Sequence, residues 1–299
     1  MSLHIKAVTD VLNRRQVDIL PRGELFIHRG FLDHFFGSNK GEYVKQLKRA
    51  AQCLGLSLIG VELDTDEAQS PLLDRGCKQL EEYFIVACID GPIAKGTKYH
   101  GFFNTMINMR KKPLFLTEMA KRLLEDINQK AKKIHAKGFK AIAIADDIAG
   151  NQGLLFSFDF FMESVYPLYR EIADIIRENG LFAFFHSDGD VRRIIRPLID
   201  SGYDCLHPVD TQAGLDLYGL KEEFREKLCF MGHIDTITWT EERIHQEIGR
   251  AENEFKEGGL ILGSTSGISL ETVNDQLGAL YPLWERWSGK RRGMKEVTL

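Results

Sequence analysis

Residues 138–147 read GFKAIAIADD, and residues 180–189 read GLFAFFHSDG. Both segments begin with glycine, continue as a short apolar run and end in charged side chains. An amphipathic stretch with helical spacing precedes each of them, at residues 115–136 and 159–179. Glycine after a periodic stretch is typical of a helix end, and a short apolar run bounded by turn residues is typical of a buried strand. The two segments therefore predict two successive helix–glycine–strand units.

The same alternation extends over most of the chain. It also predicts helices over residues 191–200 and 240–257 and an N-terminal helix within residues 1–17. The eight apolar runs that we expect to form strands cover residues 19–27, 56–63, 83–89, 141–145, 181–185, 205–209, 228–231 and 260–262. Strands joined by helical crossovers run parallel, and eight of them close into a (β/α)₈ barrel.

The 299 residues suit one barrel domain, residues 1–299, with a short N-terminal helical extension. We expect residues 289–299 to fray. The alternative fold is an open, doubly wound sheet. That fold would carry a glycine-rich dinucleotide fingerprint after an early strand, and the sequence contains none.

Composition and charge exclude several classes of protein. The net charge is −4, and no stretch concentrates enough Lys and Arg to neutralise many phosphates, so we expect no nucleic-acid partner. No segment is apolar enough to suggest a signal peptide or a membrane span. The five cysteines are widely spaced, and their number is odd. We therefore expect reduced thiols and a cytoplasmic protein.

Polar side chains recur where the predicted strands end, which is where barrel enzymes carry their chemistry. In chain order they are Glu62, Asp64, Asp90, Asp146, Asp147, His186, Asp188, His207, Asp210, His233, Asp235 and Ser266, and Glu24 lies inside the first predicted strand. Such a rim has two chemical interpretations. A mixed histidine and carboxylate set can hold Zn²⁺ with an open position, or the same groups can exchange protons with a bound substrate without metal.

Several of these residues also have a purely structural interpretation. Acids after strands often cap the next helix, and His207 before Pro208 is typical of a hydrogen-bonded structural histidine. The pair His186 and Asp188 favours function, because residues two apart in an extended segment face the same side. For Asp146 and Asp147 we expect one to face the barrel and the other to hold a loop. Residues 263–267, GSTSG, can cradle a phosphate, but a tight turn also requires such residues.

Four stretches together carry a family resemblance. They are IAIADDIAGNQG from residue 142, LFAFFHSDGDVRRIIRPLIDSGYDCLHPV from residue 181, KLCFMGHIDTITW from residue 227 and GGLILGSTSGI from residue 258. The chain resembles the uroporphyrinogen decarboxylase superfamily, which contains the decarboxylase itself and the corrinoid-linked methyltransferases. The resemblance covers most of the chain and is weaker before about residue 80.

The decarboxylase branch carries an arginine-rich Met-Arg-x-x-Gly-Arg turn after the first strand, which suits a ligand with many carboxylates. Residues 21–35 here read PRGELFIHRGFLDHF and supply only Arg22 and Arg29. Ser266 stands where the decarboxylase has a histidine. Asp64 stands near the place of its essential acid.

Thiol-methylating members of the other branch bind zinc through His-x-Cys after the fifth strand and a cysteine after the eighth. This chain has His186, with Asp188 and Ser266 at the two cysteine positions. The resemblance therefore implies a harder oxygen and nitrogen set, with Asp147 or Glu163 as further ligands, or a site without metal.

The resulting hypothesis is a corrinoid-linked methyltransferase that moves a methyl group between a small substrate and a corrinoid on a separate protein, with or without zinc. The metal set is His186, Asp188 and Glu163, and the catalytic set is Asp147, His233 and Asp235. The substrate-binding set is Glu24, Asp64, Asp90, Asp146, His207 and Ser266. The alternatives are a metal-free tetrapyrrole decarboxylase and a barrel that binds a corrinoid or tetrapyrrole without turnover. A homodimer is an open expectation.

Overall fold

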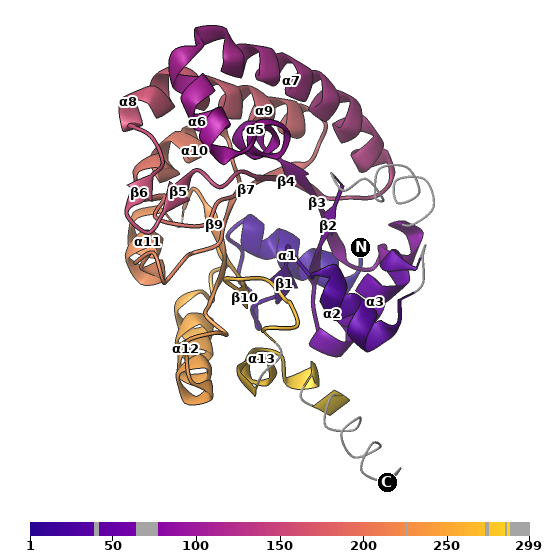
Figure 1. Ribbon diagram of the computed structural model, residues 1–299. Coiled ribbons are helices and arrows are strands. Elements are labelled where there is room, and N and C mark those ends of the chain that lie inside the picture. The colour runs from indigo at the N-terminus through magenta and orange to yellow at the C-terminus, as the bar shows by residue number, and fades with distance from the viewer. Residues whose placement is uncertain (39–41, 64–76, 225, 273–274, 285, 288–299) are drawn as a thin grey trace.

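Eight parallel strands form one ring in the order β1-β2-β3-β4-β7-β8-β9-β10. Figure 1 shows how the helices are arranged around these strands. The computed structural model describes residues 1–38, 42–63, 77–224, 226–272, 275–284 and 286–287. The barrel strands are β1 (Gly23–Glu24), β2 (Leu58–Glu62), β3 (Phe84–Asp90), β4 (Ala141–Ala145), β7 (Phe182–His186), β8 (Cys205–His207), β9 (Cys229–Ile234) and β10 (Leu260–Ser264). Parallel bridges from Arg22 to Leu262 and from Ile27 to Ile268 close the ring. The predicted (β/α)₈ barrel is confirmed.

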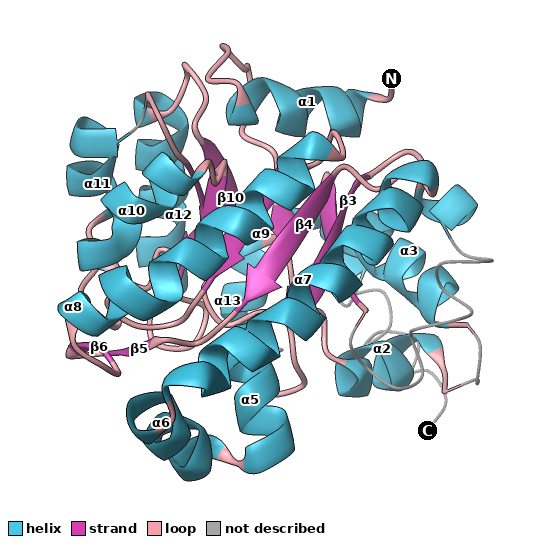
Figure 2. Cartoon of the chain, turned by 90° about the horizontal axis from the view of Figure 1, so that it is seen from above, coloured by secondary structure: helices cyan, strands magenta, loops and turns pink. Residues whose placement is uncertain are grey.

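Helices surround the ring and connect its strands (Figure 2). They are α1 (Leu3–Leu12), α2 (Arg29–Phe36), α3 (Tyr43–Leu54), α5 (Pro92–His100), α6 (Phe102–Lys111), α7 (Pro113–Ala136), α8 (Phe158–Phe160), α9 (Tyr166–Glu178), α10 (Ile195–Ser201), α11 (Leu217–Phe224), α12 (Glu241–Glu254) and α13 (Asp275–Leu280). Short 3₁₀ turns cover Cys77–Leu80 and Arg192–Ile194, and a π-helical turn covers Phe161–Val165. No helix in the described ranges is both long and apolar enough to cross a membrane.

The N-terminal helix α1 lies across the end of the barrel where the strands begin (Figure 2). The amide of Gly259, just before β10, donates to the carbonyl of Val11 at 2.9 Å. The amide of Val17 donates to the carbonyl of Lys256 at 3.0 Å. The extension therefore covers the N-terminal face and leaves the C-terminal face open.

The strand and helix predictions differ from the structure in several places, of which four bear on the barrel mouth or its loops. The predicted strand 19–27 contributes only β1, because residues beyond it bond to the chain after β10, where the Ile268 amide donates to Phe26. The predicted strand 205–209 ends at His207, since Pro208 has no amide to donate. The predicted helix 159–179 contains the π-helical turn. The sequence patterns also gave no sign of a small hairpin between β5 (Ala149–Gly150) and β6 (Gly153–Leu154).

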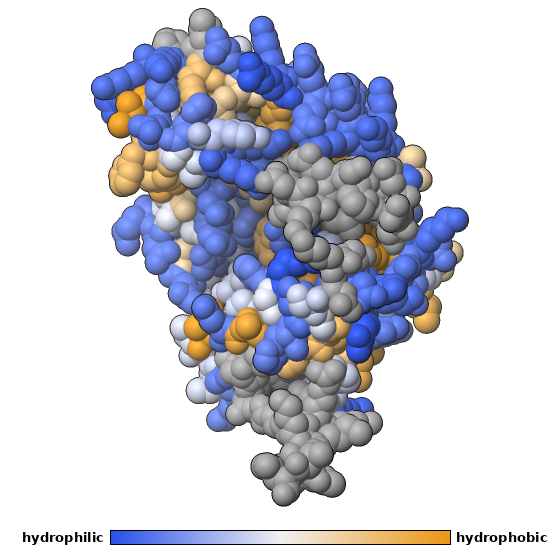
Figure 3. Space-filling view, turned by 45° about the vertical axis from the view of Figure 1, so that its right-hand side comes forward, coloured by the Kyte–Doolittle hydropathy of each residue, from blue (hydrophilic) through white to orange (hydrophobic). Residues whose placement is uncertain are grey.

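Apolar strands fill the core, and most of their side chains are fully buried, which is usual for a parallel barrel covered by helices. Some large apolar side chains stay at the surface, among them Phe103 and Tyr99, which are 79% and 76% exposed. Hydrophobic surface gathers at the upper left of the molecule in Figure 3.

A buried carboxyl group joins the first and last strands of the ring. Glu24 is fully buried, and it accepts hydrogen bonds from the Ser264 amide at 2.8 Å, the Ser264 hydroxyl at 3.0 Å and the Tyr281 hydroxyl. Burial raises the pKa of Glu24 from 4.5 to about 7, although these three donors lower it in part. The structure thus places this predicted substrate-binding residue within the seam between β1 and β10.

Replacing Glu24 by Gln should flatten the pH dependence of stability. Because the folded-state pKa is raised, Glu24 favours folding below pH 4.5, and this contribution is lost as the pH rises toward about 7. The full loss is on the order of 3 kcal/mol. We expect wild type to lose stability across this window relative to E24Q, in urea unfolding at pH 5 and pH 8. Parallel pH profiles for the two proteins would contradict the raised pKa.

Candidate metal centre at the barrel mouth

The register of three neighbouring strands brings two histidines together at the barrel mouth. Ala145 of β4 pairs with His186 of β7, and His186 pairs with His207 of β8. Paired residues on adjacent strands face the same side. The Nδ1 atoms of His186 and His207 accordingly lie 2.8 Å apart.

Asp147, His186 and Asp188 form a cluster whose candidate ligand atoms all lie within 4.8 Å of one another. The Nε2 atom of His186 lies 3.7 Å from Oδ1 of Asp147. The same Oδ1 accepts the amide of Asp188 at 3.1 Å. The imidazole is largely buried, whereas the Asp147 side chain is 63% exposed. The cluster therefore has a fixed inner edge and an edge open to solvent.

The hydrogen bond between the histidines constrains the tautomer of His186. His207 is only 1% exposed, and burial, followed by the nearby His186, holds its pKa well below the usual value. His207 is therefore neutral, and one of the two Nδ1 atoms must donate. When His186 donates, its Nε2 lone pair faces the two aspartates. Phe26 packs against both rings, with centroid distances of 4.8 Å to His186 and 6.2 Å to His207.

The loop that carries Asp188 is fastened on both sides. The amide of Gly189 donates to Asp210 at 3.0 Å, and the amide of Asp190 donates to the Gly150 carbonyl at 2.9 Å. Gly189 has φ +91, and a Cβ atom there would meet the carbonyl carbon of Ala149 at 2.7 Å, so only glycine suits this position. Burial raises the pKa of Asp188, the aspartates Asp147 and Asp210 add to the rise, and His186 opposes it.

A cavity of about 190 Å³ adjoins the cluster. Phe26 and Ala145, the neighbours of His186, form one side of it, and Glu62, Asp90 and Lys98 supply its polar groups. Lys98 Nζ lies 3.7 Å from Asp90 Oδ2. Burial raises the pKa of Glu62, and Asp90 adds to the rise. The predicted residue Asp90 thus lines a cavity large enough for a small ligand.

The neighbouring residues Asp146 and Asp147 have different surroundings, as the sequence led us to expect. Asp146 is fully buried and accepts the amides of Ile93 and Ala94 at the start of α5, at 3.2 and 2.5 Å, and the hydroxyl of Tyr169 at 2.8 Å. Burial raises its pKa to about 7. Hydrogen bonds within the fold engage the carboxyl group of Asp146, whereas the carboxyl group of Asp147 belongs to the cluster.

The two predicted catalytic residues of β9 and its loop lie in different surroundings. His233 has φ +87, and its Nε2 atom lies 2.9 Å from Glu247 of α12, so its ring points toward the surrounding helices. Asp235 accepts the amides of Ile237 and Thr238, both at 2.9 Å, and thereby shapes the loop after β9. Neither side chain is part of the three-residue cluster.

The remaining predicted residues are dispersed. Glu163 is exposed on the π-helical turn, and Ser266 is exposed after β10, with its hydroxyl 3.5 Å from that of Thr265. Asp64 lies outside the described residues.

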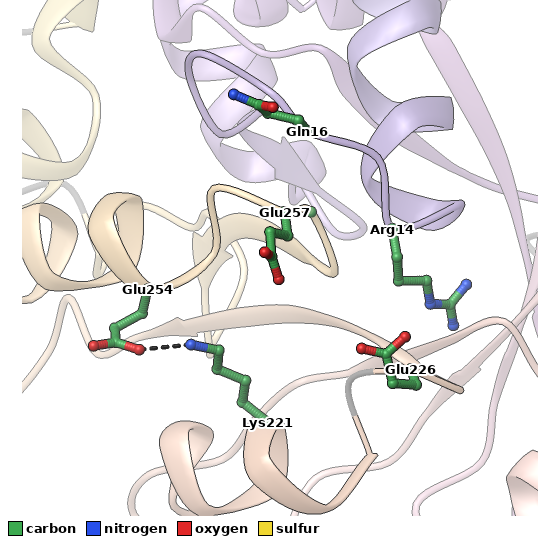
Figure 4. A pocket seen from close by; sticks show the side chains of 7 residues that line it. Arg14, Gln16, Lys221, Glu226, Glu254 and Glu257 are labelled. Carbon is green, nitrogen blue, oxygen red and sulfur yellow. Dashed lines mark hydrogen bonds and ion pairs between the residues drawn. The ribbon is translucent and has the colours of Figure 1, made fainter.

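A second polar pocket, of about 250 Å³, lies at the opposite end of the barrel (Figure 4). Its lining comes from the segments after α1 and before β9 and β10 and from α11 and α12. Lys221 and Glu254 pair across it at 2.6 Å. Its charges largely compensate one another, and it is remote from the histidine pair.

A model of the family described as uroporphyrinogen decarboxylase (URO-D) matches residues 87–287. The chain belongs to the uroporphyrinogen decarboxylase family. Among solved structures, a methyltransferase from Methanosarcina mazei is 17% identical, with a TM-score of 0.73 over 96% of this chain and 100% of that one. An L-ribulose 3-epimerase is 14% identical, with a TM-score of 0.51 over 94% and 99% of the two chains. A search of curated proteins found no match.

In this member of the uroporphyrinogen decarboxylase family, several residues of the mouth were not predicted from the sequence as functional residues. Phe26 contacts both histidines, and Lys98 lines the adjoining cavity, but neither directly follows a predicted strand. Glu62 does end a predicted strand, and that position was the available signal. Tyr169 and Tyr281 donate to the buried acids from remote helix and loop positions, which no local pattern reveals.

Replacing Asp146 by Ala should destabilise the protein far more than replacing Asp147 by Ala. D146A removes the acceptor for two helix amides and a tyrosine and should lower the free energy of unfolding by roughly 2–4 kcal/mol. D147A changes an exposed side chain and should stay within about 0.5 kcal/mol of wild type. Urea unfolding of the two variants measures the difference. Equal losses would show that Asp146 does not hold α5.

Proposed function

We propose that this protein is a corrinoid-dependent methyltransferase that moves a methyl group between a small substrate and a corrinoid carried by a partner protein. The observation that carries the proposal is the cluster of Asp147, His186 and Asp188 at the mouth of a barrel of this family. The fold shared with the Methanosarcina mazei methyltransferase supports it.

The donor set fits a zinc ion. One imidazole nitrogen and two carboxylate oxygens are common zinc ligands, and three protein ligands leave a position open. The contact with His207 matches the usual environment of a metal-binding histidine, whose second ring nitrogen is held by another group. A bound zinc ion supplies a Lewis acid that polarises an oxygen or another leaving atom.

The chain's own residues would hold and orient the reactants. His186, fixed by His207 and Phe26, provides the rigid ligand, and Asp147 and Asp188 complete the set from the open side. The cavity beside Phe26 would bind the small substrate, with Lys98 and Asp90 as its polar contacts.

Three predicted residues take other roles in this proposal. Asp235, His233 and Asp146 are positioning residues, because loop and helix contacts occupy their side chains.

The charge of the mouth favours methyl transfer over tetrapyrrole decarboxylation. A porphyrinogen carries many carboxylates and requires cationic partners. The described mouth instead contains the five acids Glu62, Asp90, Asp147, Asp188 and Asp210, and the cation that lines its cavity, Lys98, lies 3.7 Å from Asp90. Arg22 donates through Nε to the Leu280 carbonyl at 3.0 Å, and Arg29 stacks on Tyr43 at 4.1 Å.

Zinc binding should depend on His186. We expect chelator-treated protein to take up one zinc ion per chain, and H186A to bind zinc roughly 100-fold more weakly, because the only nitrogen ligand is lost. Competition with a chromophoric chelator measures the affinity, and H245A, at an exposed position on α12, is the matched control. Equal zinc affinity in H186A and H245A would exclude this site.

Two substitutions of His207 separate the effect of its hydrogen bond to His186 from the effect of its size. In H207N the amide lies near the former Nδ1 position, whereas in H207Q it lies one bond further out. We expect H207N to stay within roughly tenfold of wild-type zinc affinity and H207Q to lose more, because only Asn can reach the Nδ1 atom of His186. Identical affinities for H207N, H207Q and wild type would show that this hydrogen bond does not orient the ligand.

Methyl transfer itself can be tested with free corrinoid. Zinc-loaded protein is incubated with reduced cobalamin and with methanol, trimethylamine or 3-methoxybenzoate as donor, and methylcobalamin is followed by absorbance. We expect methylation from one donor class, with a loss of at least about 100-fold in H186A. Decarboxylation of uroporphyrinogen without methyl transfer would overturn the proposal in favour of the decarboxylase.

A further inference from the structure

A third cavity lies between α6 and the segment that follows the β5–β6 hairpin. Its volume is about 610 Å³, which falls within the range of about 300–1,000 Å³ usual for pockets that bind small molecules. Its apolar walls are formed by Met106, Ile107, Met109, Leu155, Phe156 and Phe160. The cavity does not share any residue with the one beside Phe26.

The apolar walls remain accessible to a ligand. Ile107 is 49% exposed and Leu155 is 41% exposed, and each contributes to one side. The rings of Phe156 and Phe160 lie edge to face, with centroids 5.5 Å apart. Two methionines add flexible thioether side chains, which adapt to ligands of different shape.

Two polar side chains line this cavity, one cationic and one neutral. Arg110 lines it, and its guanidinium forms no hydrogen bond or ion pair within the described ranges. Ser157 also lines it, and its Oγ atom accepts the amide of Phe160 at 3.2 Å, which leaves the hydroxyl proton available to a ligand. None of the described lining residues is acidic.

We infer that this cavity binds an organic anion with an apolar body, whose carboxylate or sulfonate pairs with Arg110 and accepts the hydroxyl of Ser157. The aromatic and thioether walls bury the body of the ligand, and the unpaired guanidinium fixes its charged end. A neutral apolar ligand would leave Arg110 without a partner, and a cationic ligand would be repelled by it.

Hydrogen bonds connect the wall of the cavity that contains Leu155 to the segment that carries the cluster. The amide of Leu155 donates to the Ile148 carbonyl at 2.9 Å, and the amide of Ile148 donates to the Ser187 hydroxyl at 3.1 Å. Ser187 lies between His186 and Asp188. This hydrogen-bonded path links one wall of the cavity to the segment that carries the cluster, but binding of an anion in the cavity requires neither metal nor methyl transfer.

The test uses the full chain and a fluorescent probe, 8-anilinonaphthalene-1-sulfonate, which combines an aromatic body with a sulfonate. We expect saturable binding to one site, weakened roughly tenfold or more in R110Q, because a charged hydrogen bond is lost. K111Q is the matched control, since it removes the same charge from the next residue, which does not line the cavity. I107Q should also weaken binding, through lost apolar contact.

A competition arm tests the sign of the charge. Dodecanoate should displace the probe at lower concentration than dodecyltrimethylammonium. Equal affinities of R110Q and K111Q, equal displacement by the two amphiphiles, or no binding of the probe to folded protein would each overturn the inference. H186A should bind the probe as wild type does, so failure of the metal proposal and failure of this one are distinguishable.

Discussion

The parallel register of β4, β7 and β8 is the constraint on which the candidate centre depends. It aligns Ala145, His186 and His207 across three neighbouring strands and thereby places two imidazoles in hydrogen-bond contact inside the mouth. The aspartates of the cluster follow within two residues of these strand ends, so the same register brings them together. A shift of one residue in either pairing would turn the histidines to opposite faces.

The buried acids at the edge of the mouth have a structural role. Glu24 holds the seam between β1 and β10, and Asp146 holds the start of α5. Their raised pKa values reflect burial rather than exposure to a substrate. The neighbouring Asp147 is exposed, and among the described residues it accepts only the amide of Asp188. In this barrel, the two fully buried carboxyl groups maintain geometry, and the cluster takes its carboxyl groups from the more exposed Asp147 and Asp188.

The sequence predicted the barrel because each strand has a short apolar run and most helices end at glycine, and both signals are local. It also predicted His186 and Asp188 as a pair, because two residues on one extended segment face one side. It did not predict that His233 turns toward α12, since this depends on successive positive φ values at Gly232 and His233. Nor could it predict that Glu163 lies exposed on a π-helical turn, because such a turn has no clear sequence signature.

The cluster of Asp147, His186 and Asp188 contains oxygen and nitrogen donors and no sulfur. Oxidants such as peroxide attack thiolates first, so a centre of this composition has no group that would become a sulfenic acid. The thiol of Cys88 beside the adjoining cavity is buried, which raises its pKa, and it lies 3.6 Å from the Leu25 carbonyl, so it stays in the unreactive protonated form. The composition of the mouth thus removes one route of oxidative damage, the oxidation of a metal-binding thiolate.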